Sequence, residues 1–487
     1  MPARRVVVVG YGMAGARLAE EVRALDPDGA RVALTVVGAE PHAAYNRVLL
    51  STVLAGGVGV DAVRLHEPDW GPRNGVDLRV GTEVVLVDRA AREVRLADGR
   101  ALPYDALVLA TGSSPWMPPV EGLHGPDGRP APGVVAFRDL DDCLRILAAA
   151  RPGAPVAVLG GGLLGLEAAR GLVGRGNLVT VVHPLGHPME RQLDAGAGRV
   201  LADALGRTGV EFRFDRLARR YRPGSGLELD DGSVVPAELL VVSTGVRPEA
   251  ELARACGLLV ERGVVVDDAL RTSDPSVYAL GDCAEHRGEV NGLVQPAWEQ
   301  ATVLAALLTG ADPGIRYRGT PVVTRLKARG IDLTSLGEVH VDVGEPGVEV
   351  LRVEDPTRGR YAKIVLRDNL VVGGVLLGVP DAAATVTQLF DQRRPAPDDR
   401  LALLLGRALV TGCAATDPAD LPATTLVCRC NTVRKEQLVD AWNTGARAVG
   451  ALATATRATT GCGTCLDVVT AIADWLATRK PAPDLAG

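Results

Sequence analysis

Four of the eight cysteines in the chain gather near its C-terminal end, as Cys428, Cys430, Cys462 and Cys465. They form a C-x-C pair followed by a C-x-x-C pair. Clustering of this kind in a large chain is typical of a metal site rather than of a disulfide framework. Four thiolates are the common ligand set of an iron–sulfur cluster, and they bind a structural zinc ion equally well. The spacing therefore predicts a metal centre, with helices expected over residues 433–442 and 466–476.

A second chemical signal is the glycine turn Gly10-Tyr11-Gly12-Met13-Ala14-Gly15. It follows an expected Val-rich strand over residues 5–9 and precedes an expected helix over residues 16–25. In such a turn the first glycine permits the tight bend, the second lets backbone N–H groups approach a pyrophosphate, and the third lets helix and strand pack closely. Glu40 follows the next strand, where a carboxylate can bind both ribose hydroxyls. The pattern predicts a dinucleotide site formed by Gly10, Gly12, Gly15 and Glu40.

The same pattern returns at Gly160, Gly162 and Gly165, after an expected strand over residues 156–159. Here the second strand, expected over residues 178–182, ends at His183 instead of an acid. A carboxylate at this place would repel a 2′-phosphate, and an arginine would favour it. We therefore expect modest discrimination between NADH and NADPH, while a purely structural role for His183 at the strand end stays equally open.

Composition limits what kind of protein can present these sites. At about 150 residues per domain, 487 residues predict three or four domains. Apolar residues make up 47% and charged residues 23%, which favours compact folding. The net charge is −6 without a basic run, so we expect no nucleic-acid partner. No apolar stretch reaches the roughly 18 residues of a membrane span, and glycines interrupt the only N-terminal segment resembling an export signal, so we expect a cytoplasmic protein without a membrane partner.

The two glycine turns, Ala110-Thr111-Gly112 after a short strand, and the segment TSDPSVYALGD at residues 272–282 together resemble the FAD-dependent pyridine nucleotide reductases over about residues 4–310. This resemblance implies that the first turn holds FAD and the second holds NAD(P)H. It implies a catalytic carboxylate at Glu167, near the nicotinamide and the flavin. It places the segment 244–248 at the crossing of the two dinucleotides. The remaining cofactor-binding residues that it implies are Arg47, Ala110, Thr111, Gly112, Gly245, Gly281 and Asp282.

Departures from that family narrow the resemblance. The redox cysteine pair of disulfide reductases is missing, and residues 45–52 contain no cysteine for peroxidase chemistry. Thr52 stands where rubredoxin-reductase-like proteins tend to have lysine. With the segment Met189-Glu190-Arg191-Gln192-Leu193-Asp194, the chain resembles the flavin part of assimilatory nitrite reductase large subunits and nitrate reductase electron-transfer subunits. The four-cysteine segment resembles the bacterioferritin-associated ferredoxin-like [2Fe–2S] domain.

The predicted fold class is α/β, with two nested Rossmann-like dinucleotide-binding domains of three layers, a small α+β domain and a small helical iron–sulfur domain. The expected boundaries are residues 1–115 with 245–312 for FAD, 116–244 for NAD(P), 313–392 for the α+β interface domain, 393–424 for a linker, 425–478 for the [2Fe–2S] domain, and 479–487 for a tail.

The function implied is an electron-transfer subunit that takes hydride from NAD(P)H onto FAD and passes single electrons through a [2Fe–2S] cluster to a separate nitrate or nitrite reductase. Because no sirohaem domain follows, nitrite reduction by this chain itself is not expected. Two alternatives stay open. One is an NAD(P)H:ferredoxin/rubredoxin reductase or flavin NAD(P)H oxidase, and the other is a zinc-stapled redox-sensing interaction protein. The oligomeric state, including a homodimer, is left open.

Overall fold

The computed structural model describes residues 2–404, 418–419 and 421–478. Cys413, residues 405–417 and 420 of the expected linker, and the whole expected tail lie outside these ranges. The chain divides into two compact units. The first consists of Met1–Leu50, Val58–Trp116 and Val246–Thr320, and the second consists of Ser51–Gly57, Met117–Gly245 and Pro321–Gly487.

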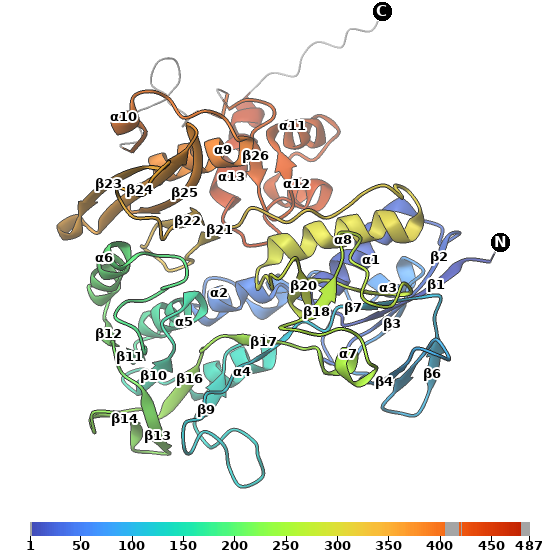
Figure 1. The fold of residues 1–487 in the computed structure, drawn as a ribbon, viewed down its shortest axis with the longest axis horizontal. Coiled ribbons are helices and arrows are strands. Elements are labelled where there is room, and N and C mark those ends of the chain that lie inside the picture. Colours follow the sequence, from blue (N-terminus) through green and yellow to red (C-terminus); the bar gives the residue numbers. More distant parts are fainter. Residues whose placement is uncertain (1, 405–417, 420, 479–487) are drawn as a thin grey trace, which may run out of the picture. The chain divides into compact units, whose positions relative to one another are not determined.

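The first unit is built on a five-stranded parallel sheet in the order β19-β7-β1-β2-β3. The buried residues of its central strands, 6–9 and 106–109, are Val, Leu and Ala, because both faces of a parallel sheet are covered. Helices α1 (Met13–Leu25) and α8 (Val294–Thr309) pack together, and the indole N–H of Trp298 donates to the Met13 carbonyl at 3.1 Å (Figure 1). The sheet strands are β1 (Arg4–Val9), β2 (Val32–Val37), β3 (Asp77–Arg79), β7 (Ala106–Leu109) and β19 (Val277–Ala279).

Smaller elements complete this unit. A three-stranded antiparallel sheet carries β4, β5 and β6, and two-stranded sheets pair β8 with β17 and β18 with β20. Their bounds are β4 (Val84–Asp88), β5 (Glu93–Leu96), β6 (Ala101–Pro103), β8 (Ser113–Pro115), β17 (Val246–Pro248), β18 (Val264–Val266) and β20 (Ala284–His286), with helices α3 (Trp70–Arg73) and α7 (Glu251–Ala255). The short helix α2 (Leu50–Leu54) runs across the boundary between the two units.

The second unit repeats the parallel design in the strand order β12-β11-β10-β16-β9. These strands are β9 (Val134–Ala136), β10 (Pro155–Leu159), β11 (Leu178–Val182), β12 (Val210–Arg213) and β16 (Leu239–Val242). The accompanying helices are α4 (Leu140–Ala149), α5 (Leu163–Gly174) and α6 (Ala195–Gly206), and a small antiparallel sheet comprises β13 (Ala218–Arg222), β14 (Gly226–Leu229) and β15 (Val234–Val235).

An antiparallel sheet follows in the same unit, in the order β21-β22-β25-β24-β23, with α9 packed against β25 (Figure 1). Its core includes the fully buried Ile364 and Val386. The bounds are β21 (Val323–Arg325), β22 (Leu333–Gly337), β23 (Glu349–Asp355), β24 (Arg360–Arg367), β25 (Leu370–Leu377), α9 (Pro380–Gln392) and α10 (Arg400–Leu404).

The cysteine-containing segment forms a hairpin of β26 (Leu426–Cys428) and β27 (Val433–Arg434), followed by α11 (Lys435–Asn443), α12 (Val449–Thr456) and α13 (Leu466–Thr478). Helix α12 is an addition to the two helices expected from sequence. Its residues are mostly small (Gly, Ala and Thr), so they give little helical periodicity, and the helix packs through Leu452, which is fully buried.

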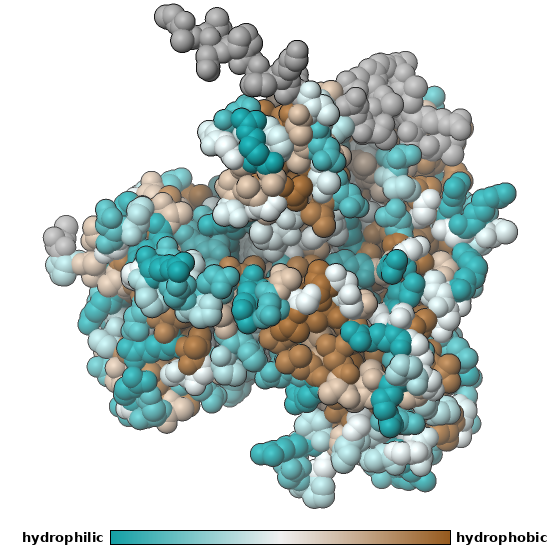
Figure 2. Space-filling model, turned by 180° about the vertical axis from the view of Figure 1, so that it is seen from behind, coloured by the Kyte–Doolittle hydropathy of each residue, from teal (hydrophilic) through white to brown (hydrophobic). Residues whose placement is uncertain are grey.

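The predicted α/β class with two Rossmann-like sheets is confirmed by this topology. The glycine-turn helices begin at Met13 and Leu163, earlier than the starts at residues 16 and 166 expected from sequence, so that Gly15 and Gly165 lie inside the first helical turn. No helix in the described part of the chain is long and apolar enough to cross a membrane. On the face drawn in Figure 2, hydrophilic residues are common and hydrophobic ones gather in a patch near the middle of the view.

Candidate functional site

The three glycines of the first turn have different structural roles. Gly10 has φ +116°, and a Cβ there would lie 2.1 Å from the Ala110 carbonyl oxygen. A Cβ on Gly15 would lie 2.0 Å from the Gly10 carbonyl oxygen. Gly12 has an ordinary φ of −80°, and its Cβ would meet nothing nearer than the Arg47 guanidinium at 3.9 Å. The fold itself therefore requires the first and third glycines, whereas the space beside the second remains open at the N-terminus of α1.

The second turn reproduces this geometry. Gly160 has φ +115° and its Cβ would lie 2.2 Å from the Ser243 carbonyl oxygen, while a Cβ on Gly165 would lie 2.1 Å from the Gly160 carbonyl oxygen. A Cβ on Gly162 would have no neighbouring atom within 4 Å. An open backbone at a helix N-terminus suits a pyrophosphate, because its N–H groups and the helix dipole favour negative charge. Both turns thus fit the dinucleotides predicted for them.

Glu40 lies beyond the end of β2 and is held by two neighbours. Its carboxylate accepts a hydrogen bond from the Tyr45 hydroxyl at 2.6 Å and forms an ion pair with Arg47. The Arg47 guanidinium is also the nearest group to Gly12. Arg47 therefore links the expected ribose-binding acid to the expected pyrophosphate turn, and it places a positive charge beside both.

The remaining residues predicted for this site lie on neighbouring loops of the first unit. Residues 110–112 directly follow β7, and the Thr111 hydroxyl donates to the Glu249 carbonyl at 2.5 Å. Asp282 accepts a hydrogen bond from the Ser113 hydroxyl at 2.9 Å. Gly281 donates its N–H to the Gln300 side chain at 2.8 Å. Burial raises the pKa of the Cys283 thiol above its ordinary value, which disfavours a reactive thiolate there.

A buried hydrogen-bond network supports the first turn and was not predicted from sequence. The Tyr11 hydroxyl lies 2.5 Å from Nδ1 of His66, whose Nε2 lies 2.7 Å from the Glu20 carboxylate. The His66 ring stacks on Trp70 with a centroid separation of 3.9 Å. Tyr11 stands between Gly10 and Gly12, so the network fixes the side chain at the centre of the turn.

His183, at the end of β11, is turned back onto the second glycine turn. Its Nδ1 accepts the N–H of Gly161 at 3.1 Å, and its Nε2 lies 3.2 Å from the Glu190 carboxylate. Burial lowers the pKa of His183, and Glu190 acts in the opposite direction. His183 thus shapes the turn with one nitrogen, while Glu190, one-third exposed, brings a carboxylate to the place where the strand itself supplies none.

Glu167, expected to be catalytic, lies in the first turns of α5 with its side chain only 1% exposed. It accepts hydrogen bonds from the Ser51 hydroxyl at 2.5 Å and from the Lys327 ammonium at 2.8 Å. Its other oxygen accepts the Lys327 backbone N–H at 3.0 Å. Sequence reasoning noted that Thr52 replaces a lysine in helix α2, but it missed that a lysine arrives from the loop after β21. Gly245, predicted for the same region, has φ +105° and open space at its Cβ position.

The segment 189–194 connects the second glycine turn to the antiparallel sheet. At one end the Met189 N–H donates to the Gly161 carbonyl at 3.0 Å. At the other end Asp194 caps α6 and accepts hydrogen bonds from Tyr361 at 2.7 Å and from the buried Lys363 at 2.8 Å. The segment therefore fixes the sheet domain to the dinucleotide domain inside the second unit.

The four predicted metal-binding cysteines come together as two thiol pairs. A hydrogen bond from Cys465 lowers the pKa of Cys428 to about 6. A hydrogen bond from Cys430 lowers the pKa of Cys462 to about 5, and the Arg325 guanidinium acts in the same direction. Among the described residues no three such side chains converge on one metal-sized centre. Two thiols on each side suit a cluster with two irons better than one tetrahedral zinc ion.

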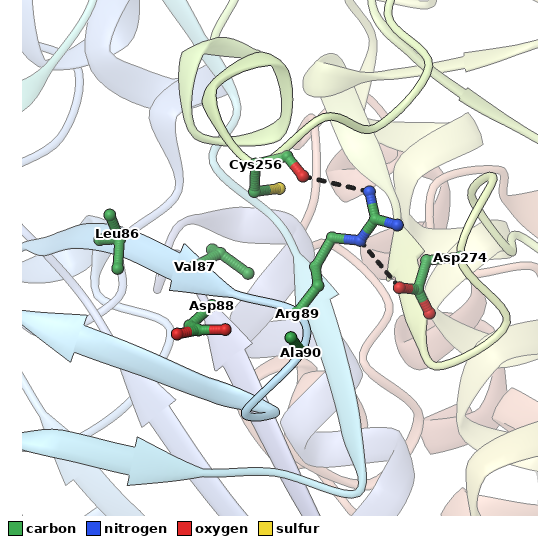
Figure 3. Close-up of a pocket in the computed structure, with 7 residues that line it drawn as sticks. All are labelled: Leu86, Val87, Asp88, Arg89, Ala90, Cys256 and Asp274. Atoms are coloured by element: carbon green, nitrogen blue, oxygen red, sulfur yellow. Dashed lines mark hydrogen bonds and ion pairs between the residues drawn. The ribbon is translucent and has the colours of Figure 1, made fainter.

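A surface hollow of about 560 Å³ lies apart from the residues predicted for the sites (Figure 3). It is lined by Leu86, Val87, Asp88, Arg89, Ala90, Cys256 and Asp274. Its arginine donates to Asp274 at 2.9 Å and to the Cys256 carbonyl at 3.1 Å. Burial raises the pKa of the Cys256 thiol. The arginine of this hollow is thus held by its neighbours, and burial disfavours the thiolate form of its cysteine.

Comparison with known families agrees with this geometry. The pyridine nucleotide-disulphide oxidoreductase family matches residues 4–302. The chain belongs to this family. The rubredoxin NAD⁺ reductase C-terminal domain matches residues 322–394, and the BFD-like [2Fe–2S] binding domain matches residues 426–475. The chain is therefore an oxidoreductase whose cofactors are FAD, NAD(P)H and a [2Fe–2S] cluster, as predicted.

Individual relatives show which members of the family the chain resembles. The chain is 36% identical to a nitrite reductase [NAD(P)H] of Bacillus subtilis over 96% of its length, covering 57% of that protein. It is 34% identical to the assimilatory nitrate reductase electron transfer subunit of the same organism, again over 96% of its length, covering 59% of that protein. The chain thus spans less than two-thirds of these curated relatives. It is also 35% identical to a rubredoxin-NAD(+) reductase of Alcanivorax borkumensis over 66% of its length, covering 83% of that protein.

Solved structures show the same fold. In the covalent putidaredoxin reductase–putidaredoxin complex, a chain 26% identical matches with a TM-score of 0.73, over 84% of this chain and 99% of the other. A ferredoxin reductase from Rhodopseudomonas palustris, also 26% identical, matches with a TM-score of 0.71, over 81% of this chain and 96% of the other. Both support the reductase assignment.

Proposed function

We propose that this protein takes electrons from NAD(P)H and delivers them singly to a separate nitrate or nitrite reductase. The observation that carries the proposal is the presence, in one chain, of two open glycine turns and a module of paired thiols. The bound FAD would accept hydride, and the bound [2Fe–2S] cluster would accept one electron at a time. Similarity to an assimilatory nitrate reductase electron transfer subunit over 96% of the chain supports this choice of acceptor.

The residues of the chain have distinct parts in this proposal. The open backbone at Gly12, with Arg47 beside it, binds the FAD pyrophosphate, while Glu40 binds the ribose. Residues 110–112 with Gly281 and Asp282 complete the FAD site. Gly162 offers the corresponding backbone to the nicotinamide cofactor.

Glu167 is the carboxylate that orients the reacting end of the nicotinamide. Its counter-ion Lys327 keeps a negative charge tolerable at a buried position. Cys428, Cys430, Cys462 and Cys465 supply the four thiolates of the cluster.

A second candidate function is reduction of a small soluble carrier. The observation that favours it is the match of residues 322–394 to the C-terminal domain of rubredoxin reductases. In that case electrons would leave the flavin directly for the carrier, and the thiol module would not be needed for turnover.

Replacing Cys462 with Ser in the full chain separates these candidates. We expect the variant to bleach its flavin with NADH under anaerobic conditions at the wild-type rate but to lose turnover of nitrate or nitrite reductase, because the one-electron exit is damaged. Cys256→Ser is the matched control, since this cysteine lies outside the module. Wild-type reductase turnover by Cys462→Ser would contradict the proposed path. Stoichiometric zinc without iron in the wild-type protein would contradict the cluster.

A further inference from the structure

The four-thiol module is attached to the antiparallel sheet domain through a residue that stands between two of its cysteines. Arg429 follows Cys428 and precedes Cys430. Its guanidinium forms an ion pair with Asp391 near the end of α9 and donates to the Pro321 carbonyl at 3.4 Å. The side chains of Arg429 and Asp391 are only 14% and 15% exposed. The contact is therefore largely shielded from water. In such a shielded environment charges interact more strongly than on an open surface.

A second arginine reaches the same place from the sheet domain. Arg325 ends β21, and although burial raises the pKa of the same Asp391 carboxylate, the positive charge of Arg325 acts to lower it. The Nε atoms of Arg325 and Arg429 are buried and make no hydrogen bond within the described part of the chain. Each of these two buried N–H donors is therefore available to an acceptor that the described residues do not supply.

The charges of these three side chains affect how easily a cluster beside them is reduced. Two guanidinium groups and one carboxylate leave one net positive charge next to the thiol pairs. A cluster bound by four thiolates becomes more negative by one unit when it accepts an electron. Nearby positive charge in a shielded environment stabilises the reduced form, and nearby negative charge opposes it.

We propose that Arg429 and Arg325 raise the reduction potential of the [2Fe–2S] cluster and that Asp391 moderates this effect while it holds the module in place. The sheet domain then has a specific role in the electron path, because it contributes one of the two cations. All three are positioning residues and make no bond to iron. The inference rests on the cluster assignment and is independent of which reductase receives the electrons.

The test is a redox titration of the cluster in the full-length protein with dithionite and mediators at pH 8, followed by electron paramagnetic resonance. Arg429→Gln and Arg325→Gln should each lower the midpoint potential, because each removes a stabilising cation. Asp391→Asn should raise it. We expect each change to correspond to about a tenfold shift in the ratio of reduced to oxidised cluster, which is about 59 mV for one electron. Exposed Arg394, mutated to Gln, is the control for loss of a charge elsewhere on this domain and should have little effect.

The test is specific because the arginine and aspartate variants should shift the midpoint potential in opposite directions. If the ion pair had a merely structural role, Arg429→Gln and Asp391→Asn would shift the midpoint potential of the cluster in the same direction, since both break one ion pair. That result would overturn the proposal. So would shifts no larger than that of Arg394→Gln. If Arg429→Gln does not retain a cluster, the midpoint potentials of Arg325→Gln and Asp391→Asn still test the proposal, because they should shift in opposite directions. Iron and sulfide contents of the wild-type protein, measured first, separate failure of this inference from failure of the cluster assignment.

Discussion

The carboxylate of Glu167 and the ammonium of Lys327 lie 2.8 Å apart although 160 positions separate them in the sequence. The glutamate comes from the helix after the second glycine turn, and the lysine comes from the antiparallel sheet domain. The same lysine also donates its backbone N–H to the other carboxylate oxygen. The sheet domain is thus joined directly to the residue expected to act in hydride transfer.

Breaking this pair should destabilise the second unit. Lys327→Met leaves a buried carboxylate without its counter-ion, and we expect a loss of about 3 kcal/mol in the free energy of unfolding. The double variant Glu167→Gln/Lys327→Met should recover part of this loss, because the uncompensated charge is gone. Urea unfolding of both proteins gives the comparison. Equal losses in the single and double variants would mean that Lys327 contributes packing rather than charge.

Gly12→Val should give a folded protein without flavin. Its backbone is extended and a Cβ meets only the flexible Arg47 side chain, so the fold tolerates the change, but the added methyl groups occupy the space predicted for the pyrophosphate. The ratio of flavin to protein absorbance, with the melting temperature as a check on folding, measures the outcome.

Gly162→Val is the matched control for that experiment. It should retain FAD and lose affinity for NAD(P)H, because it fills the equivalent space in the second turn. Retention of full FAD by Gly12→Val would show that the first turn does not bind the pyrophosphate.

Acidification should weaken the second glycine turn through His183. Because burial lowers the pKa of His183 in the folded state, the unfolded chain binds a proton first as the pH falls through about 6.5. Stability linked to this group is therefore present above pH 6.5 and decreases below it. The protonated ring also cannot accept the Gly161 N–H. Melting temperatures at pH 7.5 and 5.5 should differ more for the wild type than for His183→Gln, and equal differences would exclude His183 as the cause.

Discrimination between the two nicotinamide cofactors should be modest. We expect kcat/KM for NADH and NADPH to differ by at most about a hundredfold, or roughly 3 kcal/mol, because β11 ends in histidine rather than an acid. Glu190 is the carboxylate nearest to that position in the described contacts of His183. Glu190→Gln should therefore shift the ratio towards NADPH. A much larger NADH preference in the wild type that Glu190→Gln leaves intact would place the selective group elsewhere.

Local sequence patterns were sufficient for the parts of this protein in which neighbouring residues cooperate. Each glycine turn contains its own strand, bend and helix within about 20 residues, so the requirement for Gly10 and Gly160 at positive φ could be anticipated from spacing alone. The two cysteine pairs likewise predicted the thiol module. Helix α12 was missed because its residues, mostly Gly, Ala and Thr, carry little periodic signal.

Tertiary structure decided which distant side chains complete the sites. Nothing in the sequence around Lys327 indicates that it meets Glu167, and nothing around Asp391 indicates that it pairs with Arg429, because each contact depends on how the antiparallel sheet packs inside the second unit. The same holds for His66 under the first glycine turn. The chain's local patterns predicted where cofactors bind. Long-range packing, which alone brings charges from separate elements together in a shielded environment, decided which residues surround them.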